Sequence, residues 1–211
     1  MTDTKAKLLA ATVESLREDG IAGLSARAVA ARAEVNQALV FYHFKTVPAL
    51  VDAAVRASVD ASVEFYRSRF AGVTSLLELL RVGRELHARE KAAGNVAMVA
   101  QLLAGAQRDD TLAATARYAM ERWHAELEPT VRRLLAGSPL AQIADPAGLA
   151  RAISSGFLGL ELYEGVDAAG AAQALDALEQ LGVLVEVVDE LGTVARRAVR
   201  TKLRRARSST R

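Results

Sequence analysis

Residues 24–45 have the sequence LSARAVAARAEVNQALVFYHFK, in which two short apolar patterns of helical period are separated by about three residues. Ser25 and Asn36 are favourable N-cap residues. Each directly follows an apolar residue and precedes a valine by four positions, which is the arrangement of a hydrophobic staple. This spacing predicts helices over residues 25–33 and 36–43 with an abrupt turn between them. Two short helices joined in this way are typical of a helix-turn-helix, whose second helix enters the major groove of DNA.

The residues that the second of these helices would expose have side chains suited to DNA. Gln37 can offer a donor and an acceptor to an adenine edge, and Ala38 could touch a thymine methyl group. The side chains that can donate to phosphates are Arg27, Tyr42, His43 and Lys45. Arg27 could instead reach a guanine. The alternative interpretation is a solvated helical hairpin, and spacing and composition alone leave both open.

The composition is that of an ordinary globular chain: of its 211 residues, 25% are charged and 51% are apolar. It contains no cysteine, which excludes disulfides and thiolate metal sites. The first 20 residues alternate charged with apolar residues and lack a signal-peptide core. The longest uncharged stretch, residues 92–107, is shorter than the roughly 20 apolar residues that span a bilayer. We therefore expect a cytoplasmic protein with no membrane partner.

Charge is unevenly distributed along the chain. Residues 1–47 contain six Lys/Arg and five Asp/Glu, residues 48–192 contain thirteen and twenty, and residues 193–211 contain eight and none. An acidic body followed by a basic C-terminal segment indicates contact with a polyanion, although arginine-rich tails are often only solvated.

Almost every stretch has helical character, because Ala, Leu, Arg and Glu dominate and apolar residues recur every three or four positions. The predicted helices span residues 4–19, 25–33, 36–43, 47–70, 74–90, 94–106, 109–136, 146–164, 169–191 and 193–206. Short helices give way to longer ones near residues 46–50. We therefore predict an all-α fold with a small N-terminal domain over residues 1–46 and a larger domain over residues 47–211.

Two segments, Leu24–Ala30 and Val40–Lys45, resemble the DNA-binding region of the TetR family, and the resemblance extends over about residues 5–55. It implies an N-terminal three-helix helix-turn-helix domain joined to a larger helical domain that binds an effector and dimerises. The positions that it implies to face DNA are Ser25, Arg27, Asn36, Gln37, Tyr42 and His43, to which the side-chain chemistry adds Ala38 and Lys45. The implied core of the small domain contains Val29, Ala30, Ala33, Val40 and Phe44.

Three residues depart from the family's pattern. Glu34 occupies a turn position where the family usually has glycine, so a positive φ there would strain the backbone by about 1 kcal/mol. Phe41 replaces a common tyrosine and Val47 replaces a lysine that usually contacts phosphate. These departures affect the expected affinity and the choice of DNA site more than the fold.

Signals for the effector site are weak. Aromatic and soft side chains are scattered over the middle of the chain, and the candidate ligand-binding residues are Phe65, Met98, Tyr118, Trp123 and Phe157. The alternative is that each belongs to an ordinary hydrophobic core. With three histidines and no cysteine, neither a metal effector nor a cofactor is expected.

Signals for a dimer are stronger. The helices at 146–164 and 169–191 are apolar on more than one side, and Gly156 and Gly159 permit close approach. The predicted interface residues are Ile153, Phe157, Leu160, Leu181, Leu184 and Val188. A two-fold four-helix bundle, with two helices from each chain, would cover these surfaces and resembles the interface usual in the family. The alternative is a single-chain core.

These features together predict a DNA-binding repressor that a small, mostly apolar ligand releases from a palindromic operator. The alternatives are a small-molecule-binding helical protein or an all-α enzyme without DNA binding. The chain contains no phosphate loop, nucleophile elbow or paired metal-ligand motif, so we expect no catalysis. Glu161, Tyr163 and Glu164 form an acidic cluster near a helix end, which usually faces solvent.

Overall fold

The computed structural model describes residues 2–136, 138–142, 144–189, 197–198 and 201–202, and within these ranges all regular structure is helical. The elements are α1 (Thr2–Glu18), η1 (Ile21–Gly23), α2 (Ala26–Arg32), α3 (Ala38–Phe44), α4 (Val47–Gly72), α5 (Leu76–Ala92), α6 (Asn95–Ala106), α7 (Asp110–Leu135), η2 (Pro139–Gln142), α8 (Pro146–Glu164) and α9 (Ala168–Asp189). The predicted all-α fold is confirmed, and the predicted helices up to residue 191 agree with the observed ones within two residues at each end. Most of the helix predicted at 193–206 lies outside the described residues.

The chain forms two compact units. Unit 1 contains Met1–Phe65 and Ala88–Arg122, and unit 2 contains Tyr66–His87 and Trp123–Arg211. The predicted boundary after residue 46 coincides with the break between α3 and α4. It stays a prediction about functional domains, because the compact units are divided at other positions along the chain.

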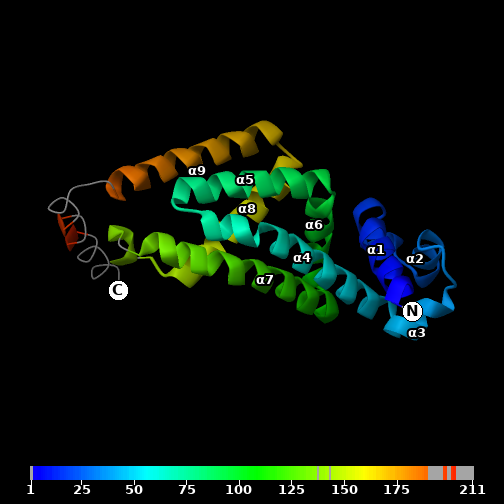
Figure 1. Cartoon of the computed structure of the whole chain (residues 1–211). Coiled ribbons are helices and arrows are strands. Elements are labelled where there is room, and N and C mark those ends of the chain that lie inside the picture. Colours follow the sequence, from blue (N-terminus) through cyan, green and yellow to red (C-terminus); the bar gives the residue numbers. More distant parts are fainter. Residues whose placement is uncertain (1, 137, 143, 190–196, 199–200, 203–211) are drawn as a thin grey trace. The chain divides into compact units, whose positions relative to one another are not determined.

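The N-terminal part of unit 1 is held by one hydrophobic cluster. Leu8, Val29, Val40 and Leu50 are each 0% exposed, and they come from α1, α2, α3 and α4. Leu24 and Val35, the residues before the two predicted caps, pack against the same cluster. Burying apolar side chains from all four helices fixes α2 and α3 on α1, an arrangement that Figure 1 shows at the N-terminal end of the chain.

A glycine makes the junction between α1 and α6 possible. Gly20 has a φ of +71°, and a Cβ placed on it would lie 2.2 Å from Gln101 Oε1. The same Gln101 oxygen accepts a hydrogen bond of 2.9 Å from the backbone N–H of Ile21. Beside it, Arg17 Nε donates to Asn95 Oδ1 at 2.8 Å. The side chains of α6 therefore bind the turn after α1 directly.

A polar network joins α4 to α7 within unit 1. Asp60 accepts hydrogen bonds from Arg122 Nε at 2.6 Å and from the Tyr118 hydroxyl at 2.9 Å. The hydrogen bond from Arg122, with that from Tyr118, lowers the pKa of Asp60. The Arg56 guanidinium lies 4.0 Å from the centre of the Tyr118 ring. Tyr118, a candidate ligand residue, is therefore engaged in a structural network.

This network predicts a pH-dependent contribution to stability. A lowered pKa means that ionised Asp60 stabilises the fold above the ordinary aspartate pKa of about 3.9, and that this stability is lost as pH falls through the folded-state pKa. Because the side chain is 45% exposed, we expect Asp60→Asn to cost less than about 1 kcal/mol at pH 7. In urea unfolding, the difference from wild type should narrow below about pH 4. Asp3→Asn, at a carboxyl that is 80% exposed, is the control and should be near wild type throughout.

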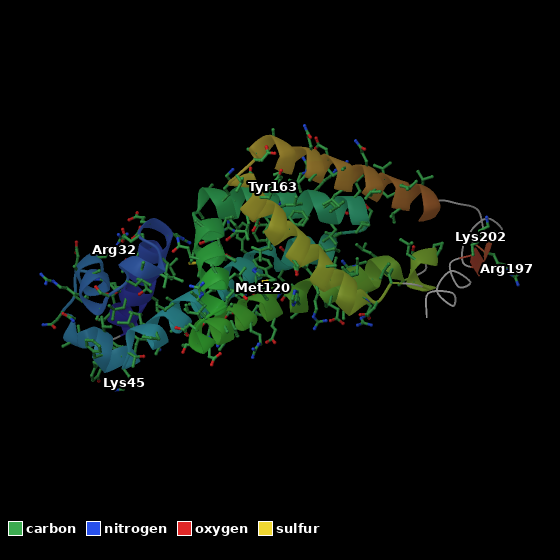
Figure 2. All side chains as sticks on the ribbon, turned by 180° about the vertical axis from the view of Figure 1, so that it is seen from behind. Arg32, Lys45, Met120, Tyr163, Arg197 and Lys202 are labelled. Carbon is green, nitrogen blue, oxygen red and sulfur yellow. The ribbon has the colours of Figure 1, made fainter. Side chains whose placement is uncertain are left out.

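Unit 2 has its own hydrophobic core. Tyr66, Phe70, Leu127 and Val131, from α4 and α7, are buried together, and Trp123 packs against both aromatic rings. Helix α9 lies along α5 (Figures 1 and 2), where Gly182 would place a Cβ 3.2 Å from Leu80. Helix α8 contacts α9. This arrangement leaves one side of both α8 and α9 exposed.

In the part of the chain that the structure describes, no single helix is both long and apolar enough to cross a membrane. The bent pair α3–α4, whose axes meet at 68°, reaches the required length and composition only when the two helices are taken together.

Candidate functional site

The helix-turn-helix is built by local hydrogen bonds at the expected positions. Ser25 Oγ accepts from the backbone N–H of Ala28 at 3.1 Å, which confirms it as the cap of α2. In the turn, Glu34 has a φ of +55°, the left-handed region that favours glycine. Glu34 therefore has the positive φ that is expected to strain the backbone at this position. The turn is closed by a hydrogen bond from the N–H of Val35 to the carbonyl of Ala30 at 3.0 Å.

Asn36 starts α3 although the helix itself begins at Ala38. The N-cap position of α3 is Gln37 rather than the predicted Asn36. Asn36 still supports the start of the helix, because its Oδ1 accepts a hydrogen bond from the N–H of Ala38 at 2.8 Å. Gln37 makes no side-chain capping hydrogen bond and is exposed. Gln37 and Ala38 therefore stand at the accessible N-terminal end of α3, the part of a recognition helix that contacts base edges.

The opposite end of α3 carries the expected phosphate donors. Tyr42 is 63% exposed, and its ring meets His43 edge-on at 5.0 Å. Lys45, labelled in Figure 2, follows α3 directly with a φ of +68°, and its Nζ donates to the Tyr42 carbonyl at 3.4 Å. Arg27 is exposed in the first turn of α2. The exposed face of α3 thus presents neutral groups at its N-terminal end and hydrogen-bond donors at its C-terminal end.

Two residues that support this face were not found from the sequence. Arg32 donates to Glu18 at 2.6 Å and to Asp19 at 3.0 Å, and the hydrogen bond to Glu18 raises the pKa of Arg32. Thr46 Oγ1 accepts from the N–H of Ala49 at 3.2 Å at the start of α4. The Thr46 cap has a signal in the sequence, a threonine before a helical pattern. The Arg32 pairs join residues 13 and 14 positions apart, and helical period does not reveal them.

Comparison of the sequence with known families agrees with this geometry. Residues 8–54, which contain the capped helices and the turn, match the family described as "Bacterial regulatory proteins, tetR family". The N-terminal part of the chain is therefore similar to the bacterial regulatory proteins of the tetR family. No curated protein matches its sequence closely enough to be a relative.

Solved structures show that the similarity in fold extends over most of the chain. A TetR-family transcriptional regulator from Rhodococcus sp. is 22% identical, with a TM-score of 0.72 over 90% of this chain and 100% of that one. A transcriptional regulator from Streptomyces coelicolor A3(2) is 22% identical, with a TM-score of 0.66 over 85% and 98%. The fatty acid degradation regulator from Bacillus halodurans is 15% identical, with a TM-score of 0.68 over 83% and 96%.

The five candidate ligand residues lie in different surroundings, three of them in unit 1 and two in unit 2. Met98 is buried in unit 1, whereas Phe65 is 53% exposed with the Arg89 guanidinium 3.6 Å from its ring centre. Trp123 belongs to the core of unit 2. Phe157 does line a cavity in unit 2, of about 100 Å³, between α5, α8 and α9. A second cavity in unit 2, open and of about 670 Å³, is lined mainly by aliphatic residues of α5, α7, α8 and α9 such as Leu76, Val131 and Leu149.

The expectation that Glu161 and Glu164 face solvent was wrong. Their side chains are 13% and 24% exposed and contact the two ring nitrogens of His87. They face α5 because α8 packs against it, and helical period alone cannot indicate this contact. Among the described residues, no group of three or more His, Cys, Asp or Glu side chains is arranged to hold a metal ion.

Helix α8 turns the residues predicted for a dimer toward its own chain, whereas α9 exposes two of those predicted on it. Ile153 packs against the core, and Phe157 and Leu160 line the small cavity, so these side chains face their own chain. The exposed side of α8 carries Gly156 and Gly159, and a Cβ on either would meet nothing within 4 Å. On α9, Leu181 and Leu184 are each 58% exposed. The side chain of Val188 lies outside the described residues.

Proposed function

We propose that this protein is a transcriptional repressor that binds a near-palindromic operator as a homodimer and leaves it when a small, mostly apolar molecule binds the larger domain. The observation that carries the proposal is the exposed face of α3. Gln37 and Ala38 lie at its accessible N-terminal end, and Tyr42 and Lys45 at the other. The repressor would act in the cytoplasm, where operator DNA is accessible to it.

Some of the proposed contacts would read the bases, and the others would position α3 on the DNA backbone. Gln37 would hydrogen-bond an adenine edge and Ala38 would lie against a thymine methyl group. Arg27, Tyr42, His43 and Lys45 would donate to phosphates and fix the register of α3 in the groove. Ser25 and Asn36 would support the two helices chiefly as caps, because their side-chain oxygens already accept backbone N–H groups.

The proposed dimer uses the exposed side of α8 and α9. Leu181, Leu184 and Val187 are each more than half exposed on α9, and Leu162 is 41% exposed on α8. Exposed apolar side chains in such number favour cover by another chain. Gly156 and Gly159 leave room for a helix to approach closely. A second copy is the favoured partner, because a two-fold axis would pair the two α3 helices with the two halves of a palindrome.

We expect Gln37→Ala to weaken operator binding by roughly 1–3 kcal/mol and to relax preference at one base position, because it removes a base-edge contact. Selection from a random duplex pool, followed by titration of the selected site, measures both effects. Lys45→Ala is the matched control: it should weaken all duplexes alike and reduce the salt dependence.

Two outcomes would contradict the proposal. A wild-type protein that selects no duplex would favour a ligand-binding helical protein or an enzyme instead. If Gln37→Ala weakens all duplexes alike, as Lys45→Ala should, Gln37 would not read a base.

A further inference from the structure

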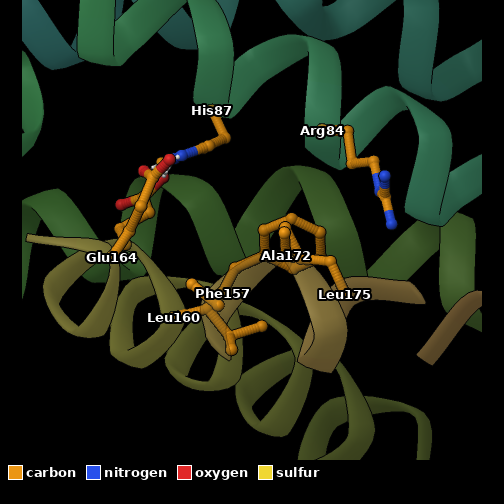
Figure 3. A pocket seen from close by; sticks show the side chains of 9 residues that line it. Arg84, His87, Phe157, Leu160, Glu164, Ala172 and Leu175 are labelled. Carbon is orange, nitrogen blue, oxygen red and sulfur yellow. Dashed lines mark hydrogen bonds and ion pairs between the residues drawn. The ribbon is translucent and has the colours of Figure 1, made fainter. Parts of the chain in front are cut away.

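The larger cavity in unit 2 has the size of a ligand site. Its volume is about 670 Å³, whereas the small cavity in the same unit has a volume of about 100 Å³. Sites for drug-sized molecules usually have volumes of about 300–1,000 Å³. The small cavity is also lined by long charged side chains, because Arg84, His87 and Glu164 surround it together with the ring of Phe157 (Figure 3). The larger cavity is therefore the one that can accommodate a drug-sized apolar molecule.

Aliphatic side chains form the walls of this larger cavity. Five of them pack against the hydrophobic core of unit 2 and remain partly exposed: Leu76, Leu134, Leu140, Ala144 and Leu149. Val131 and Leu135, two buried residues of that core, line the cavity as well. The described residues that line it include no aromatic side chain. The walls therefore suit an alkyl chain, and they offer no stacking partner to a flat ring.

Polar side chains lie at one rim of the cavity. The end of α9 lies beside the start of α5 (Figure 1), and a Cβ on Gly182 of α9 would lie 3.4 Å from Leu77 Cα. Glu186 is one turn further along the same face of α9, so it reaches the side of the cavity that Thr74 and Ser75 line. Thr74 is exposed, and Ser75 and Glu186 are partly exposed. The polar end of a ligand would lie at this rim, near water.

The lining favours an uncharged ligand. The described residues that line the cavity include one carboxylate, Glu186, and no Lys, Arg or His, so a carboxylate ligand would meet a like charge. An ammonium would gain little, because ion pairs in contact with water contribute little. The Ser75 hydroxyl accepts from the N–H of Glu78 at 3.1 Å, and a hydroxyl can also donate one hydrogen bond. The oxygen of an alcohol or a ketone could accept that bond.

We propose that this cavity binds an uncharged molecule with an alkyl chain and one oxygen-bearing end, and that this molecule is the effector. The effector role rests on the proposed function; the binding site does not. The alkyl chain would lie on Leu134, Leu140 and Leu149, and the polar end would lie at Ser75.

Filling the cavity would act on the proposed dimer surface through α9. Val185 and Glu186 line the cavity, whereas Leu184 and Val187 beside them are each more than half exposed. The cavity and the proposed interface therefore use the same turn of α9. A ligand that changes how this turn packs on α5 and α7 has different affinities for the DNA-binding dimer and the released one, which is the requirement for a switch.

The binding test uses the full chain without DNA and four probes: 1-butanol, 1-octanol, octanoate and octylammonium. In calorimetric titrations we expect 1-octanol to bind roughly a hundredfold more tightly than 1-butanol, because each buried methylene contributes a factor of about four. Octanoate should bind at least about tenfold more weakly than 1-octanol, because its charge would be brought near Glu186. Octylammonium should bind no more tightly than 1-octanol.

Two matched variants locate the site. Ala144→Phe occupies the larger cavity from a partly exposed position and should weaken 1-octanol binding at least about tenfold. Ala172→Phe adds the same ring at the small cavity, from an exposed position on α9 (Figure 3), and should leave 1-octanol binding unchanged.

A third variant tests the class of ligand by a gain of binding, which an unfolded protein cannot produce. Glu186→Lys places a cation at the rim and should strengthen octanoate binding at least about tenfold. Glu121→Lys makes the same change at an exposed position on α7 outside the cavity and should leave octanoate binding as in wild type.

The site is overturned if wild type does not bind 1-octanol, if folded Ala144→Phe binds it like wild type, or if Ala172→Phe weakens its binding instead. The uncharged class is overturned if octanoate or octylammonium binds wild type more tightly than 1-octanol, and the rim is misplaced if Glu186→Lys does not strengthen octanoate binding. The effector role is measured separately, by titrating 1-octanol into the complex with a duplex selected from a random pool. Binding at the cavity that leaves this complex intact would overturn the effector role. A ligand-free protein that selects no duplex would contradict the proposed function instead.

Discussion

A Leu184→Asp variant is expected to be monomeric at micromolar concentration and to lose specific operator binding. Leu184 is 58% exposed on α9, where the proposed two-fold interface would bury it. Symmetry places two such carboxylates in one interface, and burying each unpaired charge costs several kcal/mol. The dimer dissociation constant should therefore rise by about a thousandfold or more. Light scattering and a band shift on the selected duplex measure the two consequences.

Ala125→Asp is the matched control, because it adds the same charge to unit 2 at an exposed position on α7. It should leave both the dimer and DNA binding intact. A Leu184→Asp protein that stays dimeric would reject α9 as the interface, and a wild-type monomer would reject the dimer altogether. If Leu184→Asp is monomeric yet keeps its operator affinity, the pairing of two reading helices is wrong.

A Gly20→Ala variant should lower the free energy of unfolding by about 2–4 kcal/mol. Gly20 has a φ of +71° and a ψ of −177°, a backbone conformation that is almost restricted to glycine and costs a residue with a Cβ about 1–3 kcal/mol. The new Cβ would also lie 2.2 Å from Gln101 Oε1, so the flexible glutamine side chain must move away. Its hydrogen bond to the N–H of Ile21 is then lost, at about 1 kcal/mol or more. Urea denaturation measures the change.

A double-mutant cycle with Gln101→Ala separates the two contributions. Gln101→Ala alone should cost about 1 kcal/mol, the value of its hydrogen bond. The double variant should cost no more than Gly20→Ala alone, because the bond can be lost only once. Additive costs would mean that Gln101 does not respond to the residue at position 20. A Gly20→Ala protein as stable as wild type would contradict the strain itself.

The helices and the exposed face of α3 could be predicted because both depend on neighbouring residues. Ser25 caps α2 and Asn36 starts α3 through backbone groups two or three positions away. The positive φ of Glu34 follows from the short turn between two capped helices. Such interactions are local, so a single sequence contains all the atoms that make them.

The dimer and ligand surfaces could be predicted only in part. The spacing of apolar residues showed that α8 has a buried face. In the structure Ile153 and Phe157 lie toward their own chain, while Gly156 and Gly159 are exposed. The period of a helix gives the width of its apolar surface without saying which neighbour covers which side. The surroundings of the five candidate ligand residues could not be predicted for the same reason, since Phe65 makes a cation–π contact, Tyr118 joins a polar network, Trp123 packs in a core and Phe157 lines a cavity.

The sequence by itself determined the all-α fold, the capped helix-turn-helix and the exposed chemistry of α3. Only the tertiary structure decided that His87 lies between Glu161 and Glu164, which are 74 and 77 residues away in the chain. It likewise brought Gln101 to the turn after α1, 80 residues from Ile21. Contacts at such separations depend on how whole helices pack, and the free energy that selects the packing is shared among many buried side chains rather than written in any short stretch.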